Sequence, residues 1–329
     1  MQTVSLAFHG GSVIILVTFS ERSWLCMREY IAGIDVGSTT TKIAVVDPKS
    51  EEIIYYDYRR HSAAQIRSIY DTLNRVAEAL PDVRLRVAFT GSGAKPAADL
   101  LGLPFVQEVV ANSIALRRLY ADVGTAIELG GQDAKMLFFR HDQNGQLEVS
   151  DMRMNGSCAG GTGAFIDEVG SILKIPIEQF NAYASRGDCV YDISGRCGVF
   201  AKTDIQPLLN QGVSKENLAL SGFHAIAKQT IGGLAQGLEI TKPVIFEGGP
   251  LHFNPRLIEV FAERLALAPE DILIPEHPEV IVAYGAALSL KGLYADKHDS
   301  YVPAELAREL AARRKTLKSQ SSHGTSLQE

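Results

Sequence analysis

Two short stretches of the sequence, residues 33–43 and 126–136, carry the same pattern of residue types. Each holds an acid, a glycine two positions later and a lysine five positions after the glycine, between two apolar runs typical of strands. A strand, a glycine turn with hydroxyl or amide side chains and a second strand form a hairpin whose main-chain N–H groups can surround an anion. Two such hairpins predict two related half-domains that hold one polyphosphate between them.

Other phosphate-binding patterns do not fit these stretches. Neither contains the Gly-x-x-x-x-Gly-Lys-Ser/Thr pattern of a P-loop, and no Gly-x-Gly-x-x-Gly follows the first apolar run. Two ordinary hairpin turns are the alternative, because glycine turns are common. The repeat in matching register favours a nucleotide site over that alternative.

Two cysteines stand in glycine-rich loops just before predicted helices. Cys158 lies within residues 154–163, ahead of a helix predicted over 164–173, where the partial positive charge of the helix N-terminus favours a thiolate. Cys197 lies within residues 194–200, shortly before a possible helical run over 204–209. Glycines remove bulk, so a large inorganic group could approach the main chain and accept its N–H bonds.

Neither of these cysteines belongs to a Cys-x-x-Cys pair, so zinc-ribbon and ordinary ferredoxin patterns do not apply. Two thiolates per chain could complete a four-ligand site across a two-fold axis, which predicts a homodimer that holds one cluster. The alternative is that both are small buried residues, as free cysteines often are. We assign that role to Cys189, in a predicted strand, while Cys26 precedes the folded region.

The elements that must position these residues alternate between strands and helices twice along the chain. In the first half we expect strands over 30–36, 41–47, 52–58 and 85–90, with a helix over 66–79. In the second half we expect strands over 125–129, 134–139, 147–152, 243–247 and 272–274, and helices over 163–173, 215–237, 255–265 and 280–290. This order predicts mixed-sheet α/β domains.

Length and composition limit the classes of protein to consider. The 329 residues suffice for two domains, and 46% hydrophobic with 21% charged residues is typical of a soluble globular protein. A net charge of −6 argues against nucleic-acid binding, and no apolar run reaches the roughly 20 residues that cross a bilayer. Four cysteines do not suggest a disulfide framework, so we expect a cytoplasmic protein.

The two ends of the chain differ from the rest. Residues 1–26 lack the basic n-region of a signal peptide, and Met27 stands just before the first strand, so we expect a dispensable extension from a start site assigned too far upstream rather than a targeting segment. We expect 27–122 and 123–291 to form the two halves. Residues 292–329 would supply a helix that ends near 316–318 and a polar tail.

Taken together, these residues resemble the ATP-dependent activators of 2-hydroxyacyl-CoA dehydratases, a family that includes the ATPase subunits of benzoyl-CoA reductase. The matching stretches are residues 33–42, 128–135, 154–167, 194–199, 246–250 and 284–288. The two cysteine loops are the specific part, because the hairpins alone indicate only the superfamily of actin, heat-shock chaperones and sugar kinases. The resemblance implies two ribonuclease-H-like domains with mixed sheets around a nucleotide cleft.

The resemblance also implies an ATPase that gates electron transfer. Its cofactors would be ATP, Mg²⁺ and one [4Fe–4S] cluster per homodimer, held by Cys158 and Cys197. Nucleotide state would change the angle between two helices that start near the cluster, one from each subunit, so that ATP favours a complex with the client. The client would be a 2-hydroxyacyl-CoA dehydratase or related reductase, and the electron donor a ferredoxin or flavodoxin, with no nucleic acid or membrane as partner.

On this interpretation both glycine turns contact the phosphates. The expected phosphate ligands are Gly37, Ser38, Thr39, Thr40, Lys42, Gly130, Gly131 and Gln132. Lys42 would place a point charge on the phosphates. Asp35 and Asp133 are candidates for holding Mg²⁺ through water, because Mg²⁺ keeps part of its hydration shell. Gln132 would orient the attacking water, so Asp35, Gln132 and Asp133 are the predicted catalytic residues.

A further glycine turn would serve the adenosine. Gly248 and Gly249 would let the main chain approach it, and Asp167 would reach the ribose. The alternative for Asp133 and Asp167 is a solvated turn or helix carboxylate. Glu247 departs from the family, whose members more often place a threonine before the two glycines.

Two other functions remain open on the sequence. A sugar or small-metabolite kinase of the same superfamily, with structural cysteines, would need a carboxylate base and a polar substrate pocket, and the sequence has no distinctive sugar-binding cluster. An actin-like or chaperone-like module would need an added polymer surface or peptide domain, and the chain after Leu290 is too short for a substrate domain.

Overall fold

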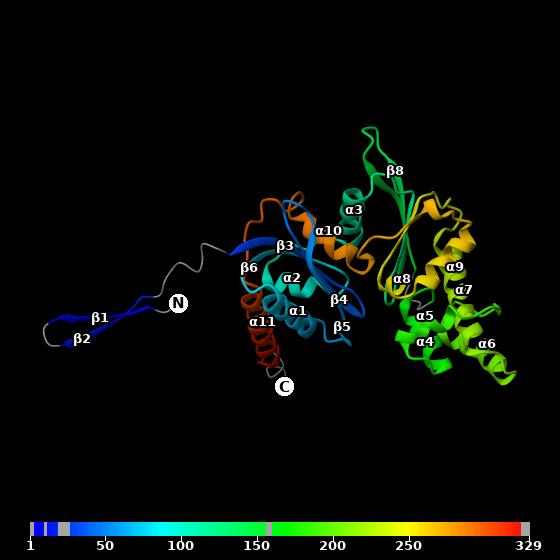
Figure 1. The fold of residues 1–329 in the computed structure, drawn as a ribbon, viewed down its shortest axis with the longest axis horizontal. Coiled ribbons are helices and arrows are strands. Elements are labelled where there is room, and N and C mark those ends of the chain that lie inside the picture. Colours follow the sequence, from blue (N-terminus) through cyan, green and yellow to red (C-terminus); the bar gives the residue numbers. More distant parts are fainter. Residues whose placement is uncertain (1–2, 10–11, 19–26, 156–159, 324–329) are drawn as a thin grey trace.

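The computed structural model describes residues 3–9, 12–18, 27–155 and 160–323. Within these ranges the chain forms two mixed sheets with helices packed around them (Figure 1). The predicted α/β class with two mixed sheets is confirmed.

The first sheet has the strand order β5-β4-β3-β6. Its strands are β3 (Arg28–Val36), β4 (Thr40–Val46), β5 (Ile53–Arg60) and β6 (Val83–Thr90). The first three form an antiparallel meander, and β6 lies parallel to β3. Its helices are α1 (Gln65–Ala79), α2 (Lys95–Leu101) and α3 (Glu108–Leu119).

The second sheet repeats this arrangement and adds one strand, in the order β11-β10-β7-β8-β9. Its strands are β7 (Thr125–Leu129), β8 (Ala134–His141), β9 (Leu147–Met154), β10 (Val244–Glu247) and β11 (Ile272–Leu273). Again a three-stranded antiparallel meander is followed by a strand, β10, that lies parallel to the first one. The two halves therefore share one topology, as the repeated hairpin predicts.

The helices of the second half follow its meander. They are α4 (Gly163–Leu173), α5 (Ile177–Ala184), α6 (Gly198–Asn210), α7 (Lys215–Leu234), α8 (Gly249–Phe253) and α9 (Pro255–Leu265). Short 3₁₀ turns, Pro269–Asp271 and Pro278–Val280, precede β11 and the next helix. The core of this half joins β7, β8 and β10 to α4, α7 and α9.

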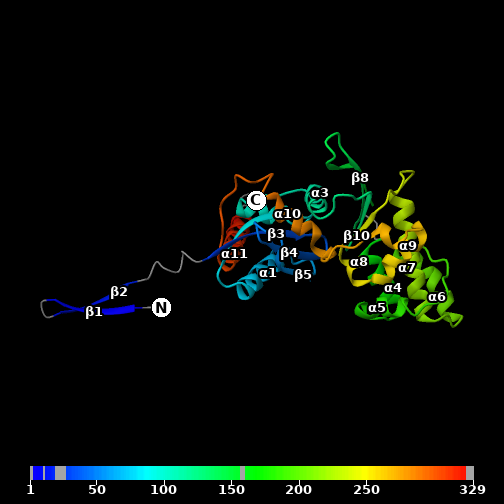
Figure 2. The ribbon, with the colours of Figure 1, turned by 45° about the horizontal axis from the view of Figure 1, so that its top comes forward.

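A core between the two sheets joins the halves. It contains Ile31 and Ala44 from the first sheet and Leu137 from the second. Helix α10 (Ile281–Ser289) contributes to this core and packs against β3 and α3, so a helix late in the chain covers the first sheet (Figures 1 and 2). A Cβ at Gly33 would overlap the main-chain oxygen of Ala283, so glycine is required where α10 crosses β3.

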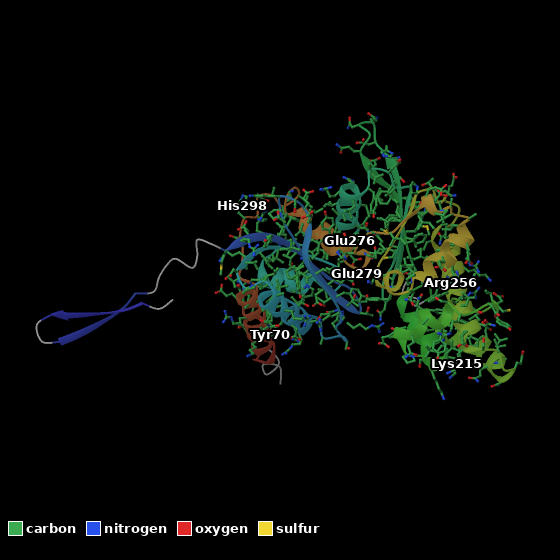
Figure 3. The ribbon with its side chains drawn as sticks, in the orientation of Figure 1. Tyr70, Lys215, Arg256, Glu276, Glu279 and His298 are labelled. Carbon is green, nitrogen blue, oxygen red and sulfur yellow. The ribbon has the colours of Figure 1, made fainter. Side chains whose placement is uncertain are left out.

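The connection that enters α10 passes between the halves. Glu276 and Glu279 lie on this connection, at the junction of the two sheets (Figure 3). Glu279 is buried, and its carboxylate lies 3.2 Å from Nδ1 of His252 in α8. The residue boundaries 27–122 and 123–291 remain a prediction, and in space α10 packs on the first sheet.

The two ends of the chain differ in whether they pack against the rest of the fold. Strands β1 (Thr3–His9) and β2 (Ser12–Thr18) pair with each other in a two-stranded sheet, and both views show them apart from the two halves (Figures 1 and 2). Helix α11 (Pro303–His323) continues past the end predicted near 316–318. Its residues Leu306 and Leu310 join the core of the first half with α1.

We therefore predict that α11 is part of the fold of the first half. Leu310→Ala should lower the free energy of unfolding by about 2–5 kcal/mol, because the side chain is fully buried. The matched control is Leu317→Ala on the same helix, where the side chain is 55% exposed and the change should be within about 0.5 kcal/mol. Urea denaturation measures both, and equal effects of the two substitutions would contradict the packing described.

Candidate functional site

A cleft of about 390 Å³ lies between the two halves. Among the described residues it is lined by Thr39, Thr40, Tyr58 and Arg60 from the first half, and by Gly131, Gly163, Ile166, Asp167, Ile177, Glu178, Gly249, Pro250, Phe253 and Asn254 from the second. Its volume falls within the usual range of small-ligand pockets. Five predicted site residues line it: Thr39, Thr40, Gly131, Asp167 and Gly249.

The two glycine turns have the same main-chain geometry and meet across this cleft. Gly37 N–H donates to the oxygen of Thr40 at 2.9 Å, and Gly130 N–H donates to the oxygen of Asp133 at 2.8 Å. A Cβ at Gly131 would overlap Oγ1 of Thr39, so the turns approach more closely than an alanine would allow. Ser38 and Gln132 are exposed and are not among the residues that line the cleft.

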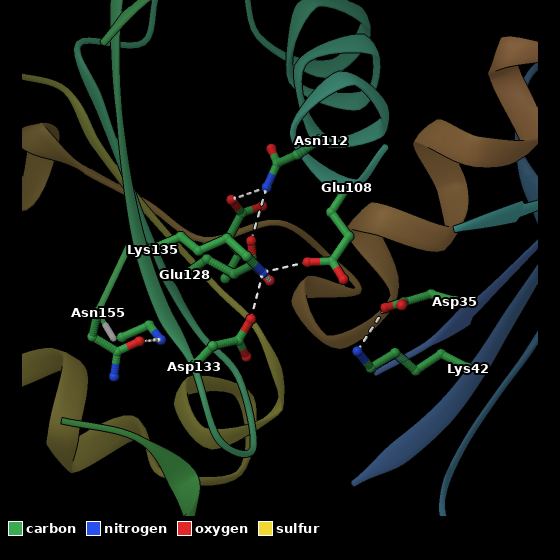
Figure 4. A network of polar contacts seen from close by, with 10 residues as sticks. Asp35, Lys42, Glu108, Asn112, Glu128, Asp133, Lys135 and Asn155 are labelled. Atoms are coloured by element: carbon green, nitrogen blue, oxygen red, sulfur yellow. Dashed lines mark hydrogen bonds and ion pairs between the residues drawn. The ribbon is translucent and has the colours of Figure 1, made fainter. Parts of the chain in front are cut away.

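Strand register places an acid opposite a lysine behind each turn. Asp35 on β3 pairs with Lys42 on β4, and their side chains form an ion pair of 2.6 Å (Figure 4). Asp35 is buried, while Lys42 is half-buried. Burial alone would lower the pKa of Lys42, but attraction to Asp35 outweighs it and raises that pKa. Lys42 therefore stays charged at the floor of the first turn.

The equivalent lysine in the second half, Lys135, is buried among three carboxylates. It lies 2.6 Å from Glu108, 3.1 Å from Glu128 and 2.9 Å from Asp133 (Figure 4). Burial would lower the pKa of Lys135, but these carboxylates raise it well above its usual value. The predicted catalytic residue Asp133 is thus held beside Lys135, with its side chain partly exposed.

A second buried carboxylate stands beside Glu128. Glu247 on β10 is in register with Glu128 on β7, and Asn112 on α3 donates to it at 2.6 Å. Its other oxygen, Oε2, has no hydrogen-bond partner among the residues that the structure describes. Burial, together with repulsion from Glu128, raises the pKa of Glu247 to about 8, so the folded protein keeps this carboxyl protonated at neutral pH.

The wall of the cleft away from the turns is apolar. Ile166, Ile177 and Phe253 line it, and the Phe253 ring lies edge-on to Tyr58 at 5.5 Å. Gly249 lies so close to Tyr58 that a Cβ would overlap its hydroxyl oxygen, and Gly248 has a φ of +95° that favours glycine. A flat aromatic or heterocyclic group would fit between these surfaces.

Helix α4 connects the second glycine turn to the cysteine loops. Its first amides donate to that turn, from Gly163 to the oxygen of Gly130 at 2.9 Å and from Ala164 to the oxygen of Gly131 at 2.7 Å. Asn155, on the other side of the first cysteine loop, bonds through Oδ1 to the N–H of Ala134 at the start of β8. Both ends of that loop are therefore tied to the strand–turn–strand unit of the cleft.

The two cysteine loops pack against each other. A Cβ at Gly160 would overlap the main-chain oxygens of Gly195 and Arg196, so the loops approach as closely as their main chains allow. Cys197 is a free, half-buried thiol at the residue that precedes α6. Cys158 lies outside the described residues.

The interpretation of Cys189 as a buried residue in a strand is wrong. The described structure has no strand at that position, and Cys189 is exposed. Val190 beside it is also exposed, so the apolar residues that suggested a strand do not enter the core.

Several cleft residues were not foreseen from the sequence, above all Tyr58, Arg60 and Phe253. Tyr58 and Arg60 lie at the end of β5, opposite the residues of β4 that follow the first glycine turn. This strand pairing was the signal from which their place near the turn could have been predicted. Phe253 follows the third glycine turn by a helical turn. Among the described residues no group of three or more His, Cys, Asp or Glu side chains could hold a metal ion, and no helix is long and apolar enough to cross a membrane.

Comparison with known proteins defines the class. Residues 32–289 match the BadF/BadG/BcrA/BcrD ATPase family. The matched range spans most of the chain and includes both glycine turns and both cysteine loops. The chain therefore belongs to this ATPase family, as the resemblance predicts.

Particular relatives extend this assignment. An uncharacterized protein of Methanocaldococcus jannaschii is 31% identical over 78% of this chain and 99% of its own length. The (R)-2-hydroxyglutaryl-CoA dehydratase activating ATPase of Acidaminococcus fermentans is 29% identical over 68% of this chain and 84% of its own length. The crystal structure of component A of the (R)-2-hydroxyglutaryl-CoA dehydratase from Acidaminococcus fermentans matches with a TM-score of 0.66 and 26% identity, over 79% of this chain and 97% of that one. The actin-like ATPase fold is thereby confirmed.

The protonated state of Glu247 leads to a prediction about pH. As pH rises from about 5 to 8, the unfolded chain releases this proton while the folded protein retains it, so the free energy of unfolding should fall. Glu247→Gln removes the titration, and its stability advantage over the wild type should grow by up to about 1.4 kcal/mol per pH unit. Urea denaturation at pH 5–8 measures this. The exposed control Glu239→Gln should keep the wild-type pH dependence, and the same slope in Glu247→Gln would contradict the prediction.

Proposed function

We propose that this protein is an ATP-hydrolysing iron–sulfur activator that transfers one electron to a (R)-2-hydroxyacyl-CoA dehydratase or a related CoA-ester reductase. The observation that carries the proposal is the attachment of α4 to the cleft. The first amides of this helix bond to Gly130 and Gly131, and the helix begins directly after the first cysteine loop. A change at the phosphate turn would therefore act on the start of α4.

In this proposal the two turns hold the phosphates of ATP. Of the residues expected to contact the phosphates, Thr39, Thr40 and Gly131 line the cleft, and the hydroxyls of Ser38, Thr39 and Thr40 would supply donors. The positive charge of Lys42 would interact both with Asp35 and with the phosphates of the nucleotide. Its fixed position behind the turn means that little reorganisation is needed when charge develops on the phosphates.

Asp35 and Asp133 would hold Mg²⁺ through its water ligands. Each carboxylate forms an ion pair with a lysine, which fixes its orientation. Gln132 stands exposed at the tip of the second turn, where its amide would reach a water that attacks the terminal phosphate. These residues orient and stabilise, which is most of what phosphoryl transfer requires of a protein.

The adenosine would occupy the apolar wall beyond the turns. The base would lie against Phe253 and Ile177, and the main chain at Gly248 and Gly249 would border it. Asp167 lines the same wall and would accept a hydrogen bond from the ribose.

Cys158 and Cys197 would hold one [4Fe–4S] cluster between two subunits, each giving two thiolates. The described residues are compatible with this group: Cys197 is free and half-buried at the residue that precedes a helix, and the glycines beside it, Gly195 and Gly198, allow a close approach of Ala225 and Glu168. When bound, such a cluster supplies one-electron transfer at low potential. The adjoining surface is apolar, since Val199 and Phe200 are exposed in the first turn of α6, as a subunit interface would require.

The same proposal covers the partners and location. The protein would work as a cytoplasmic homodimer that receives electrons from a ferredoxin or flavodoxin and passes them to the client enzyme. ATP would shift the angle between helices near the cluster only as far as it binds one arrangement more tightly than the other. Residues 1–26 would be dispensable, and residues 27–122 and 123–291 would form the two halves.

The first test of this proposal concerns the nucleotide. Lys42→Ala should lower ATP hydrolysis about a hundredfold, because a fixed charge on the phosphates is lost, and should leave the iron content unchanged. The exposed lysine of the following turn provides the control, since Lys49→Ala should hydrolyse ATP like the wild type. Anaerobic phosphate-release assays measure both variants. Unchanged hydrolysis in Lys42→Ala would show that the first glycine turn is not part of the nucleotide site.

The second test concerns the cysteines. Anaerobically reconstituted protein should carry about four irons per dimer. Cys158→Ser or Cys197→Ser should abolish the cluster absorption, whereas the exposed Cys189→Ser should retain it. Iron analysis and native mass measurement decide the matter. A monomer with a complete cluster would contradict the shared site.

A further inference from the structure

An ion pair spans the cleft between Arg60 and Asp167. Nη1 of Arg60 lies 2.9 Å from Oδ2 of Asp167, and Nη2 lies 3.1 Å from Oδ1, so the contact is bidentate. Arg60 is the last residue of β5 in the first half, and Asp167 belongs to α4 in the second. Both side chains line the cleft. The pair therefore bridges the two halves directly over the proposed nucleotide site.

The main chain fixes Arg60 beside the first phosphate turn. Arg60 is in register with Thr40 across the β4–β5 pair, and the N–H of the next residue, His61, donates to the oxygen of Thr39 at 3.0 Å. Nε2 of His61 also bonds to the oxygen of Gly37 at 3.0 Å. Arg60 is thus held next to the first glycine turn by the strand pairing and by the bonds of His61.

Among the described residues that line the cleft, Arg60 is the one cation. The lysines behind the turns are already bound to carboxylates, Lys42 to Asp35 and Lys135 to three acids. The hydrogen bonds that Arg60 donates to Asp167 raise the pKa of Arg60, which remains charged at any physiological pH. A polyanion that enters the cleft therefore meets this guanidinium first.

The present partner of Arg60 is one that a phosphate can displace. The Arg60 side chain is 60% exposed and that of Asp167 is 39% exposed, and ion pairs at such exposure stabilise a fold only weakly. A terminal phosphate carries more charge than one carboxylate and offers the same bidentate geometry to a guanidinium. Displacement would also leave Asp167 free to accept a hydrogen bond from a ribose hydroxyl.

We propose that Arg60 is a phosphate ligand of the cleft that exchanges Asp167 for the terminal phosphates when a nucleoside triphosphate binds. This inference rests on the proposed function, because it takes the cleft as the nucleotide site. In the empty cleft the ion pair holds β5 against α4. In the occupied cleft the phosphates take the guanidinium, and α4 loses that attachment to the first half.

The exchange acts on a helix that contacts the second cysteine loop. Asp167 and Glu168 are adjacent on α4, and a Cβ at Gly198, the first residue of α6, would overlap the Glu168 carboxylate. One residue of α4 therefore faces the cleft, and the next lies against the start of the helix that follows Cys197. When Arg60 exchanges Asp167 for a phosphate, α4 loses its ion pair with the first half at the cleft.

The experiment measures binding of separate parts of the nucleotide by calorimetry, using tripolyphosphate, adenosine and ATP with the full-length holoprotein. Arg60→Ala and Arg60→Gln should weaken tripolyphosphate binding by about tenfold or more and should not weaken adenosine binding, because only the phosphate contact is lost and Asp167 is freed for the ribose. Asp167→Asn should tighten tripolyphosphate binding, because the competing carboxylate charge is gone. The matched control is Arg59→Ala on the same strand, whose guanidinium bonds to Asp57 and which does not line the cleft.

The outcomes separate this inference from the function it rests on. A wild type that binds ATP, with Arg60 variants that bind tripolyphosphate equally well, would overturn the exchange and leave the nucleotide site intact. An equal loss of tripolyphosphate and adenosine binding would also overturn it, because that pattern means a general structural defect, which melting temperatures would reveal. A wild type that binds neither ATP nor tripolyphosphate would contradict the proposed function itself. Tighter tripolyphosphate binding in Asp167→Asn, together with the selective loss in both Arg60 variants, supports the exchange.

Discussion

The architecture depends on two main-chain hydrogen bonds at the start of α4. The amides of Gly163 and Ala164 would be unsatisfied at a free helix N-terminus, and here they bond to the carbonyls of Gly130 and Gly131. Those carbonyls belong to a turn whose residue Gly131 lines the cleft. One short segment therefore terminates a helix on one side and borders a ligand site on the other. Because main-chain atoms make both contacts, the turn cannot shift alone.

Buried charge keeps these turns in place. Each half sets an acid and a lysine opposite each other on the hairpin strands, so Lys42 and Lys135 are neutralised by carboxylates that the same sheet provides. Around Lys135 this compensation is more elaborate and includes Glu108 from α3. Glu247 adds a carboxyl that burial keeps protonated, and it joins β10 to α3 through Asn112. Helix α3 in turn packs on α10, which covers the first sheet, so the charged cluster lies close to the contact between the halves.

Local pattern predicted the parts of this arrangement that depend on hairpin register. The spacing of acid, glycine and lysine reflects strands that pair residue by residue, and it located both turns and indicated the superfamily, whereas the two cysteine loops indicated the ATPase family. Arg60 and Phe253 could not be predicted, because their place in the cleft depends on how two separate halves approach. Helix α10 shows the same limit, since nothing in its apolar sequence says which sheet it covers. Cys189 was misplaced because the chain beside it resembles a strand, but its N–H bonds to the side chain of Asn217 in α7 rather than to a neighbouring strand, and the residue is exposed.

The central claim is that occupancy of the cleft changes the segment beside Cys197, and hydrogen exchange on the anaerobic holoprotein tests it most directly. Residues 195–205 line no part of the described cleft, yet they contact α4 and the first cysteine loop. Adding Mg-ATP should alter amide exchange at the glycine turns, along α4 and in residues 195–205 together. Exchange that changes at the turns alone, with residues 195–205 as in the nucleotide-free protein, would contradict the claim.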